Sequence, residues 1–369
     1  MVINKNTNTT RPPQKMDPNL WSKLPEELLE HTLSCLPLKT FLYLQSTCKH
    51  FKSLTFSPSF ISKHFSSSSS SSPCTTSFLL LSHPQFTHQY FLYNTNLNSW
   101  RAQFLSLSSI VPPSATLICS EKGMLCFSVS ESNSFIICNL LARSSRTVKF
   151  PKHPFEFECF SMVLGVEGYK LFVICQDSRC SVFVYDSINQ GWENYGMQFD
   201  VNYRTQGVCF NSRLYFATRI QFGITVFDFE TGNWENSMTV SPRELIFGRL
   251  VSNGNEKLYL FGGIGNNGIS RNLKIWELSE GGENWVEIGS VPDMMCRKLV
   301  SVCFHNYEHL YVFWHQEMLC VCCYSWPEIL YYKVSRRTWH WLPKCPSMPE
   351  KWSCGFKWFS FLPQLHPYV

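Results

Sequence analysis

Several features are scarce in this chain of 369 residues, and each scarcity argues against a class of protein. With 32 basic and 27 acidic residues, the formal net charge is only +5, well short of the strong basic charge typical of nucleic-acid binding. Apolar runs of membrane-spanning length are also lacking, since the longest candidate, residues 310–324, is interrupted by polar residues at 315–317. We therefore expect neither nucleic acid nor a membrane among the partners.

Catalytic motifs are equally scarce. The sequence has no nucleophile elbow and no zinc-hydrolase motif, and the glycine cluster at 262–265 lacks the lysine of a phosphate loop. Three histidines precede three cysteines near the C-terminal end, without the paired spacing of a zinc site: His305, His309, His315, Cys320, Cys322 and Cys323. The sequence therefore predicts no catalytic residue, no metal and no cofactor.

The cysteines indicate the compartment. An apolar secretory signal is not visible, because residues 1–19 are polar. Most of the 17 cysteines lie in apolar, strand-like runs, where cysteine behaves as a small hydrophobic side chain. Free thiols of this kind are typical of a reducing compartment, so we expect the protein in the nucleus, the cytoplasm or both.

A short stretch near the N-terminus, residues 24–54, has strong helical signals. Two Leu-Pro pairs, Leu24-Pro25 and Leu36-Pro37, each open a run with helical spacing, and proline is well tolerated at the first helical position. Acidic residues follow the first pair, where they suit the helix dipole. Apolar positions cover more than half of each helix, more than a bundle of about forty residues can bury by itself. Part of this surface should be covered by a partner.

This stretch resembles the F-box, whose pattern is two spaced Leu-Pro pairs followed by Cys-Lys-x-aromatic. Here the last element reads Cys48-Lys49-His50-Phe51, with Phe51 where the family more often has Trp. The resemblance implies docking onto a Skp1-like adaptor and, through it, onto the cullin of a ubiquitin ligase. The residues that it assigns to this contact are Leu24, Pro25, Leu28, Leu36, Pro37, Leu38, Cys48 and Phe51.

From Ser77 onward, short apolar or alternating runs bounded by turn residues indicate strands, and we see no convincing helix. Trp stands six positions after the polar residue that ends a strand at 100, 192, 234 and 339. At 285 the Trp stands eight positions after that residue, and at 145 the repeat has Ser in place of Trp. Spacings of 42 to 54 residues between these positions are typical of propeller blades. The tryptophans are expected to pack between blades. The run 257–263 resembles a kelch strand, so the whole resembles the degenerate kelch repeats of plant F-box proteins.

Counting four strands per blade gives six blades, with one strand missing before Ser77 and one spare at Ser353–Leu362. The spare strand should close the ring and remove an open sheet edge. The expected fold is thus multidomain, a small all-α F-box followed by an all-β six-bladed kelch-like propeller closed by a C-terminal strand. The expected segments are a disordered tail (1–17), the F-box (18–65), a serine-rich linker (66–76) and the propeller (77–369).

Loop lengths suggest where the propeller binds. One face has tight turns, whereas the connections expected on the other face are longer: Ser82–Tyr90, Met197–Gln206, Met238–Phe247, Ile264–Asn272 and His315–Glu328. Arginines and two aromatic residues of that face are our candidates for binding an acidic or phosphorylated peptide: Arg179, Arg204, Arg219, Arg243, Arg271, Arg297, Tyr203 and Trp326. Scattered, solvated arginines are the alternative.

We therefore expect a non-catalytic substrate-recognition subunit of an SCF-type (Skp1–cullin–F-box) ubiquitin ligase, whose propeller binds a protein substrate that the sequence does not identify. Two alternatives stay open. One is a kelch-propeller enzyme of the galactose-oxidase type. The other is an F-box scaffold that binds Skp1 without engaging cullin.

Overall fold

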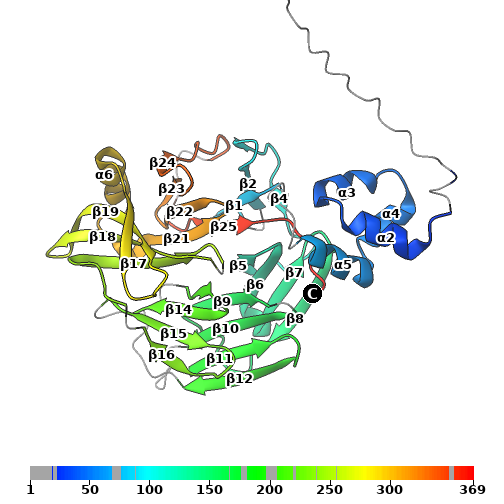
Figure 1. Cartoon of the computed structure of the whole chain (residues 1–369), viewed down its shortest axis with the longest axis horizontal. Helices are drawn as coiled ribbons and strands as arrows, with labels where there is room; N and C mark the ends of the chain where they lie inside the picture. Colours follow the sequence, from blue (N-terminus) through cyan, green and yellow to red (C-terminus); the bar gives the residue numbers. More distant parts are fainter. Residues whose placement is uncertain are drawn as a thin grey trace, which may run out of the picture. The chain divides into compact units, whose positions relative to one another are not determined.

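In the computed structural model, the described residues are 19, 23–68, 76–87, 89–165, 167–175, 181–196, 206–218, 222–237, 239–254, 256–348 and 353–369. The chain divides into two compact units, Met1–Cys74 and Thr75–Val369 (Figure 1). The described part of the first unit is helical, and the second is built almost entirely of antiparallel sheets. The candidate substrate residues at 179, 203, 204 and 219 lie outside the described residues.

Residues 23–68 of the first unit form four short helices: α2 (Glu26–Ser34), α3 (Leu38–Leu44), α4 (Lys49–Leu54) and α5 (Pro58–Ser68). Pro25 and Pro37 stand directly before α2 and α3, as the Leu-Pro pairs predict. The core is formed by Leu33, Leu38, Phe41, Leu54, Phe60 and Ile61, and the rings of Phe41 and Phe60 are 4.6 Å apart. Helix α5 ends at Ser68, three residues into the serine run that we expected to be linker.

Six antiparallel sheets form the blades of a propeller (Figure 1). Blade 1 contains β25 (Lys357–Phe361), β1 (Phe78–Ser82), β2 (Gln89–Asn94), β3 (Ser99–Trp100) and the short β4 (Leu105–Ser106). Blade 2 contains β5 (Thr116–Glu121), β6 (Met124–Val129), β7 (Ser134–Asn139) and β8 (Ser144–Lys149). Blade 3 contains β9 (Cys159–Leu164), β10 (Tyr169–Cys175), β11 (Ser181–Asp186) and β12 (Gly191–Gly196). A 3-10 turn, η1 (Ser130–Ser132), connects β6 to β7.

Blades 4 to 6 follow the same order. Blade 4 contains β13 (Val208–Phe210), β14 (Arg213–Ala217), β15 (Ile224–Asp228) and β16 (Trp234–Asn236). Blade 5 contains β17 (Leu245–Ser252), β18 (Leu258–Asn266), β19 (Ile269–Leu278) and β20 (Trp285–Ser290). Blade 6 contains β21 (Leu310–His315), β22 (Met318–Cys323), β23 (Trp326–Lys333) and β24 (Thr338–Trp341). Between blades 5 and 6 lie α6 (Asp293–Val302) and the 3-10 turn η2 (Tyr307–His309). The predicted count of six blades is confirmed.

The ring is closed by β25, which pairs antiparallel with β1, for example Leu79 opposite Ser360 and Leu81 opposite Trp358. This confirms the predicted closure. Blade 6 binds the same strand from the other side, because the Tyr311 hydroxyl accepts from the Trp358 N–H (2.9 Å) and donates to the Phe356 carbonyl (3.2 Å). The closing segment therefore connects two blades, one through a strand ladder and one through side chains.

The last residues continue beyond the closing strand onto blade 2. The Asn139 side chain donates to the Gln364 carbonyl (2.8 Å), and Leu365 is fully buried. Gly123, in the β5–β6 turn, has a φ of +85°, and a Cβ there would lie 2.7 Å from the Gln364 nitrogen. Only glycine permits this approach. The sequence reasoning did not foresee this extension of the closure.

The repeat tryptophans pack between blades, as expected. The Trp192 indole N–H of blade 3 donates to the Lys149 carbonyl of blade 2 (2.8 Å), and that of Trp100 donates to the Pro343 carbonyl beyond blade 6 (2.8 Å). Trp234 of blade 4 lies 6.1 Å from Phe172 of blade 3. These contacts combine area burial with a satisfied polar edge where the indole reaches a carbonyl.

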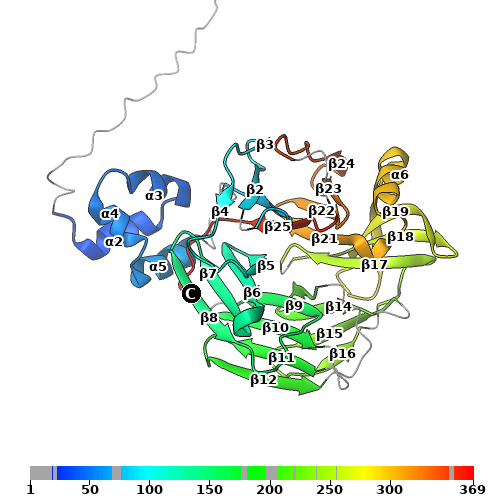
Figure 2. The same ribbon diagram turned by 180° about the vertical axis from the view of Figure 1, so that it is seen from behind.

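The expectation of no helix after Ser77 was wrong. Helix α6 begins after Pro292, has Asp293 in its first turn, and buries Cys296, Leu299 and Val300 toward the core while packing against β19. Both views place it at the edge of blade 5 (Figures 1 and 2). The helical signals, a proline start and apolar spacing of three and four residues, are present in the sequence but were outweighed by the surrounding strand pattern.

The prediction of long loops was also wrong at two places. Residues 264–272 form the end of β18, a two-residue turn at Asn267-Gly268 and the start of β19. Residues 315–328 contain all of β22 between two tight turns. Strand β21 is the first strand of blade 6, so the connection after it joins the first strand to the second. The error came from treating continuous apolar strands as loops because of a few polar residues.

Candidate functional sites

The eight candidate adaptor-binding residues have different exposures in the helical unit. Exposed are Pro25, Leu28, Pro37 and Cys48; half-buried are Leu24, Leu36 and Phe51; and Leu38 is buried. Leu28 is 56% exposed, although it is a large apolar side chain in the middle of a helix. Leu38 therefore belongs to the packing beneath the surface, whereas Leu28 is free to contact a partner.

Sequence reasoning missed two exposed apolar residues and one local role. Tyr43, on α3, is 69% exposed, and Phe56, after α4, is 47% exposed. Cys48 is the N-cap of α4, and its sulfur accepts a hydrogen bond from the Phe51 N–H at 3.4 Å. The Cys-Lys-x-Phe sequence thus sets the start of a helix, a role that its Cys alone did not suggest because Ser, Thr, Asp and Asn are the usual caps.

A buried histidine holds the helices together. The Nε2 atom of His64, on α5, lies 3.2 Å from the Leu36 carbonyl between α2 and α3. Burial lowers the pKa of His64, while its bond to the Leu36 carbonyl opposes this effect. An ion pair at 3.0 Å between Lys63 and Glu30 also joins α5 to α2. The half-buried Leu36 is therefore held through its backbone carbonyl by His64.

Four of the candidate substrate residues can be placed. Trp326 is half-buried in β23 against the core of blades 5 and 6, so it is not the loop residue that we expected. Arg243 is exposed in the turn before β17, Arg271 is exposed on β19, and Arg297 is exposed on α6. These three arginines come from the same region of the ring, blade 5 and its two flanking connections.

Strand order places these arginines on one face of the propeller. In antiparallel blades, the second-to-third turn of each blade and the connection to the next blade lie at the same end. We call this end the connection face; around blade 5 it comprises residues 237–244, 267–268 and 291–309. The three described arginines, Arg243, Arg271 and Arg297, lie at or next to this face.

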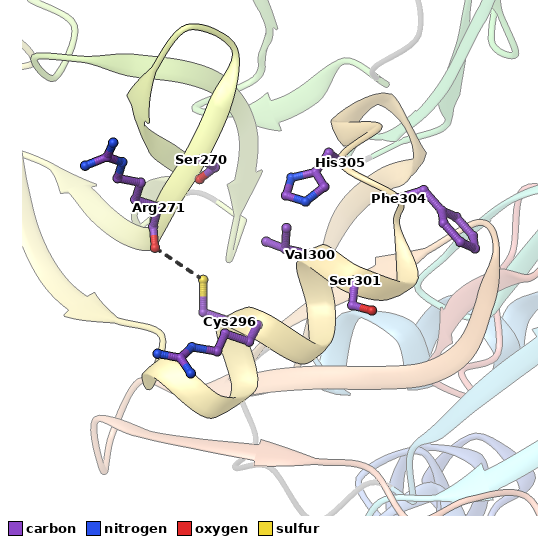
Figure 3. Close-up of a pocket in the computed structure, with 8 residues that line it drawn as sticks. Ser270, Arg271, Cys296, Val300, Ser301, Phe304 and His305 are labelled. Atoms are coloured by element: carbon purple, nitrogen blue, oxygen red, sulfur yellow. Dashed lines mark hydrogen bonds between the residues drawn. The ribbon is translucent and has the colours of Figure 1, made fainter.

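Arg271 and Arg297 both line a cleft with a volume of about 550 Å³ between the β18–β19 hairpin and α6. The other lining residues are Ser270, Cys296, Val300, Ser301, Phe304 and His305. Figure 3 shows Ser270, Val300 and His305 in the middle of the cleft, with Arg271 toward one end and Phe304 at the other. The cleft therefore offers positive charge and an aromatic ring at separate places.

Cysteine and histidine chemistry is limited at these sites. Burial raises the pKa of the Cys296 and Cys303 thiols, the latter to about 11, so neither is a reactive thiolate near neutral pH. Within the described residues, no group of three or more His, Cys, Asp or Glu could hold a metal ion. His315, one of the histidines noted in the sequence, instead contacts the hydroxyls of Ser360 (2.8 Å) and Thr95 (3.2 Å) at the ring closure.

No helix in the described part of the chain is long and apolar enough to span a membrane.

A helical unit with exposed apolar residues, followed by a closed six-bladed propeller with a cleft on one face, defines a two-part binding protein. The family comparisons agree. Residues 21–63 match the F-box domain, and residues 101–340 match the F-box associated beta propeller domain. Because the second match spans more than half of the chain, this chain belongs to the F-box proteins that carry this propeller.

Similar proteins are found in plants. F-box/kelch-repeat protein At5g43190 of Arabidopsis thaliana is 49% identical, over 96% of this chain and 89% of that protein. F-box only protein 6 of the same species is 28% identical, over 76% of this chain and 61% of that protein. Protein ABERRANT PANICLE ORGANIZATION 1 of Oryza sativa subsp. indica is 22% identical, over 95% of this chain and 90% of that protein. Together with the two domains, these relatives support a substrate-adaptor role.

Proposed function

We propose that this protein is the substrate-recognition subunit of an SCF-type ubiquitin ligase. Its helical unit binds a Skp1-like adaptor and through it the cullin, and its propeller binds the protein to be ubiquitinated. The observation that carries the proposal is the presence, in one chain, of an F-box unit and a second compact unit that is a closed propeller. A role in the nucleus or cytoplasm is part of the proposal.

The exposed side chains of the helical unit support adaptor binding. Leu28 and Tyr43 are large apolar residues on helices whose buried faces are already filled by Leu33, Leu38 and Phe41. Exposed apolar and aromatic side chains of this kind are the usual anchors of a protein interface. Pro25 and Pro37 add exposed surface at the start of the same helices.

The chain would act by proximity rather than by chemistry. Holding a substrate lysine near the ubiquitin-charged enzyme raises its effective concentration, which accelerates transfer without a catalytic group in this chain. The propeller suits this role because its blades are fixed by a closed strand ladder, so a substrate bound on one face is held in a defined position.

The proposal can be tested by co-expressing the full chain with a plant Skp1-type adaptor and measuring complex formation by quantitative co-purification. The double substitution Leu28→Glu and Tyr43→Glu should abolish capture, because it places charge in an apolar interface. Ser59→Glu and Ser62→Glu, at exposed positions of α5 outside the assigned contact residues, form the charge control. Undiminished capture by the Leu28/Tyr43 variant would contradict adaptor binding through this surface.

Two further measurements separate the alternatives. Co-purification of cullin with the adaptor complex distinguishes a ligase subunit from a scaffold that stops at the adaptor. Metal analysis of the purified chain addresses an enzyme of the galactose-oxidase type, since stoichiometric copper would overturn a purely adaptor role. We expect cullin in the complex and no stoichiometric copper.

A further inference from the structure

Blade 5 is built differently from the other blades on the connection face. Its middle strands β18 and β19 have 9 and 10 residues, compared with 6 residues in both β6 and β7 of blade 2. The connection after it contains the 10-residue helix α6. The extended hairpin and the helix form the two walls of the cleft described above.

The arginines of this cleft differ from three lysines of blade 5 and α6. Lys274 pairs with Glu287 at 2.7 Å, Lys257 with Glu277 at 2.6 Å, and Lys298 with Glu328 at 2.5 Å. Across the described residues, by contrast, no carboxylate oxygen lies within 4.0 Å of Arg271 or Arg297. This includes Asp293, the acidic residue of α6, which lies one helical turn before Arg297. In the described part of the chain, the two guanidinium groups of the cleft thus have no carboxylate at ion-pair distance, and they complement an anionic ligand.

The aromatic end of the cleft is energetically unusual. Phe304 directly follows Cys303, the C-cap of α6, and has a φ of +53°, the left-handed conformation in which glycine is usual after a helix. The helix end is capped around it, since the His305 N–H donates to the Val300 carbonyl at 3.3 Å. The Phe304 side chain is nevertheless 78% exposed. A bulky ring here incurs both backbone strain and exposure to water, which a contact with a ligand would offset.

The walls of the cleft are fixed in place by one tyrosine. The Tyr307 hydroxyl accepts from the Ser270 N–H of the hairpin (2.7 Å) and lies 3.3 Å from His305 Nδ1 at the end of α6. The Tyr307 ring stacks on Phe247 with centroids 4.6 Å apart, and its carbonyl accepts from the buried Arg249 guanidinium (2.7 Å). Because hairpin and helix are joined in this way, the cleft is formed before any ligand arrives, which lowers the entropic cost of binding.

We propose that this cleft binds an acidic segment of the substrate protein, with carboxylates at Arg271 and Arg297 and an apolar side chain against Phe304. This proposal rests on the proposed function, since it names the chemistry of the segment that the propeller selects. Carboxylates spaced along an extended peptide suit two separate guanidinium groups, and the exposed ring provides an apolar contact at the other end of the same cleft.

The test begins with selection of peptides by the purified full chain from a phage-displayed random library of about twelve residues, the length of an extended recognition segment. We expect enrichment of Asp and Glu together with Leu, Met or Phe. The affinity of the most enriched peptide is then measured by fluorescence anisotropy. Arg271→Glu with Arg297→Glu should weaken binding by at least about ten-fold, and added salt should weaken the wild-type interaction.

Two matched variants sharpen the result. Arg336→Glu with Arg337→Glu makes the same charge change in the β23–β24 turn, on the opposite face, and should leave the affinity unchanged. Phe304→Gly should weaken binding by about five-fold or more without lowering the melting temperature, because glycine relieves the left-handed strain. A Phe304→Gly variant that binds normally, or an equal loss in the Arg336/Arg337 variant, would overturn the proposal.

The remaining outcomes also decide the question. Selected peptides without acidic residues would contradict the proposal, as would a peptide that binds only when its acidic residues are replaced by phosphoserine. Adaptor capture by the same variants is measured in parallel. If the arginine variants capture the adaptor and still bind the peptide normally, the cleft is refuted and the ligase role stands. If the chain binds the peptide through the two arginines but captures no adaptor, the ligase role is refuted and the cleft stands.

Discussion

The helical unit and the propeller bury their apolar residues in different ways. The helical unit has a small core, centred on Phe41 and Phe60, and leaves Leu28 and Tyr43 exposed. The propeller has several large clusters of buried residues, and it joins its two chain ends in one sheet through β25 and β1. The helical unit thus leaves apolar surface for a partner to cover, whereas the propeller buries its own apolar surface and pairs its own strand edge. The difference matches the two tasks of the proposed function, since one unit assembles and the other presents a rigid binding face.

The largest expected effect follows from removing the closing segment. Deleting residues 353–369 takes away β25, the Tyr311 contacts and the buried Leu365, and it exposes the edge of β1. The truncated chain should be insoluble or lack a cooperative thermal transition for the propeller, while it still captures the adaptor. Deleting residues 1–23 is the control, and it should leave that transition unchanged. A soluble truncated chain with the wild-type melting temperature would show that the closure is dispensable.

A core substitution in the helical unit should have the next largest effect. Phe41→Ala removes a fully buried ring that packs on Phe60, which typically costs about 3–5 kcal/mol and exceeds what so small a unit can lose. Circular dichroism should show loss of helix with an unchanged propeller transition, and excess adaptor should restore the helix. Tyr43→Ala, an exposed change on the same helix, should shift stability by only about 0.5 kcal/mol. Simultaneous unfolding of both units in the Phe41 variant would contradict their independence.

Acid should weaken the propeller through its buried histidines. Burial lowers the pKa of His315 from 6.5 to about 4, and that of His366, where the Lys122 charge also contributes, to about 4. The unfolded chain therefore binds more protons than the folded chain between these values, so stability is fully present above about pH 6.5 and is lost as the pH falls toward 4. For His315 the loss is on the order of 3 kcal/mol.

The measurement is the free energy of unfolding of the propeller at several pH values. His315→Gln, which retains hydrogen-bonding capacity without a titrating group, should flatten the pH dependence between 6.5 and 4 and can lower the stability at neutral pH. His340→Gln, at an exposed position on β24, is the control and should leave the pH profile unchanged. A wild-type stability that is constant from pH 7 to 4.5 would contradict the account of the closure.

The fold was predictable to the extent that its signals are local and repeated. The Leu-Pro pairs gave two helix starts, and the recurring tryptophans gave the number of blades because each blade repeats the same packing problem. The closing strand was predictable from the count alone. Helix α6 and β22 were missed because each lies between apolar strands, where a short apolar run does not distinguish helix, strand and loop.

The candidate sites were predictable only in part. Arg271 and Arg297 were identified as residues of one face, but their common cleft depends on a helix that was not foreseen. Trp326 was placed in a loop and lies in a strand. Tyr43 and Phe304 were missed because exposure is a tertiary property, and an apolar residue in a helix or a turn has the same sequence pattern whether it faces the core or water.

The central claim is that the helical unit binds the adaptor while the propeller face stays available for a substrate. Hydrogen exchange of the full chain, with and without a Skp1-type adaptor, tests it most directly. We predict added protection within residues 24–56, around Leu28 and Tyr43, and unchanged exchange in the β18–β19 hairpin and α6. Unchanged exchange throughout the helical unit, or protection of the hairpin and α6 by the adaptor alone, would contradict the division of tasks between the two units.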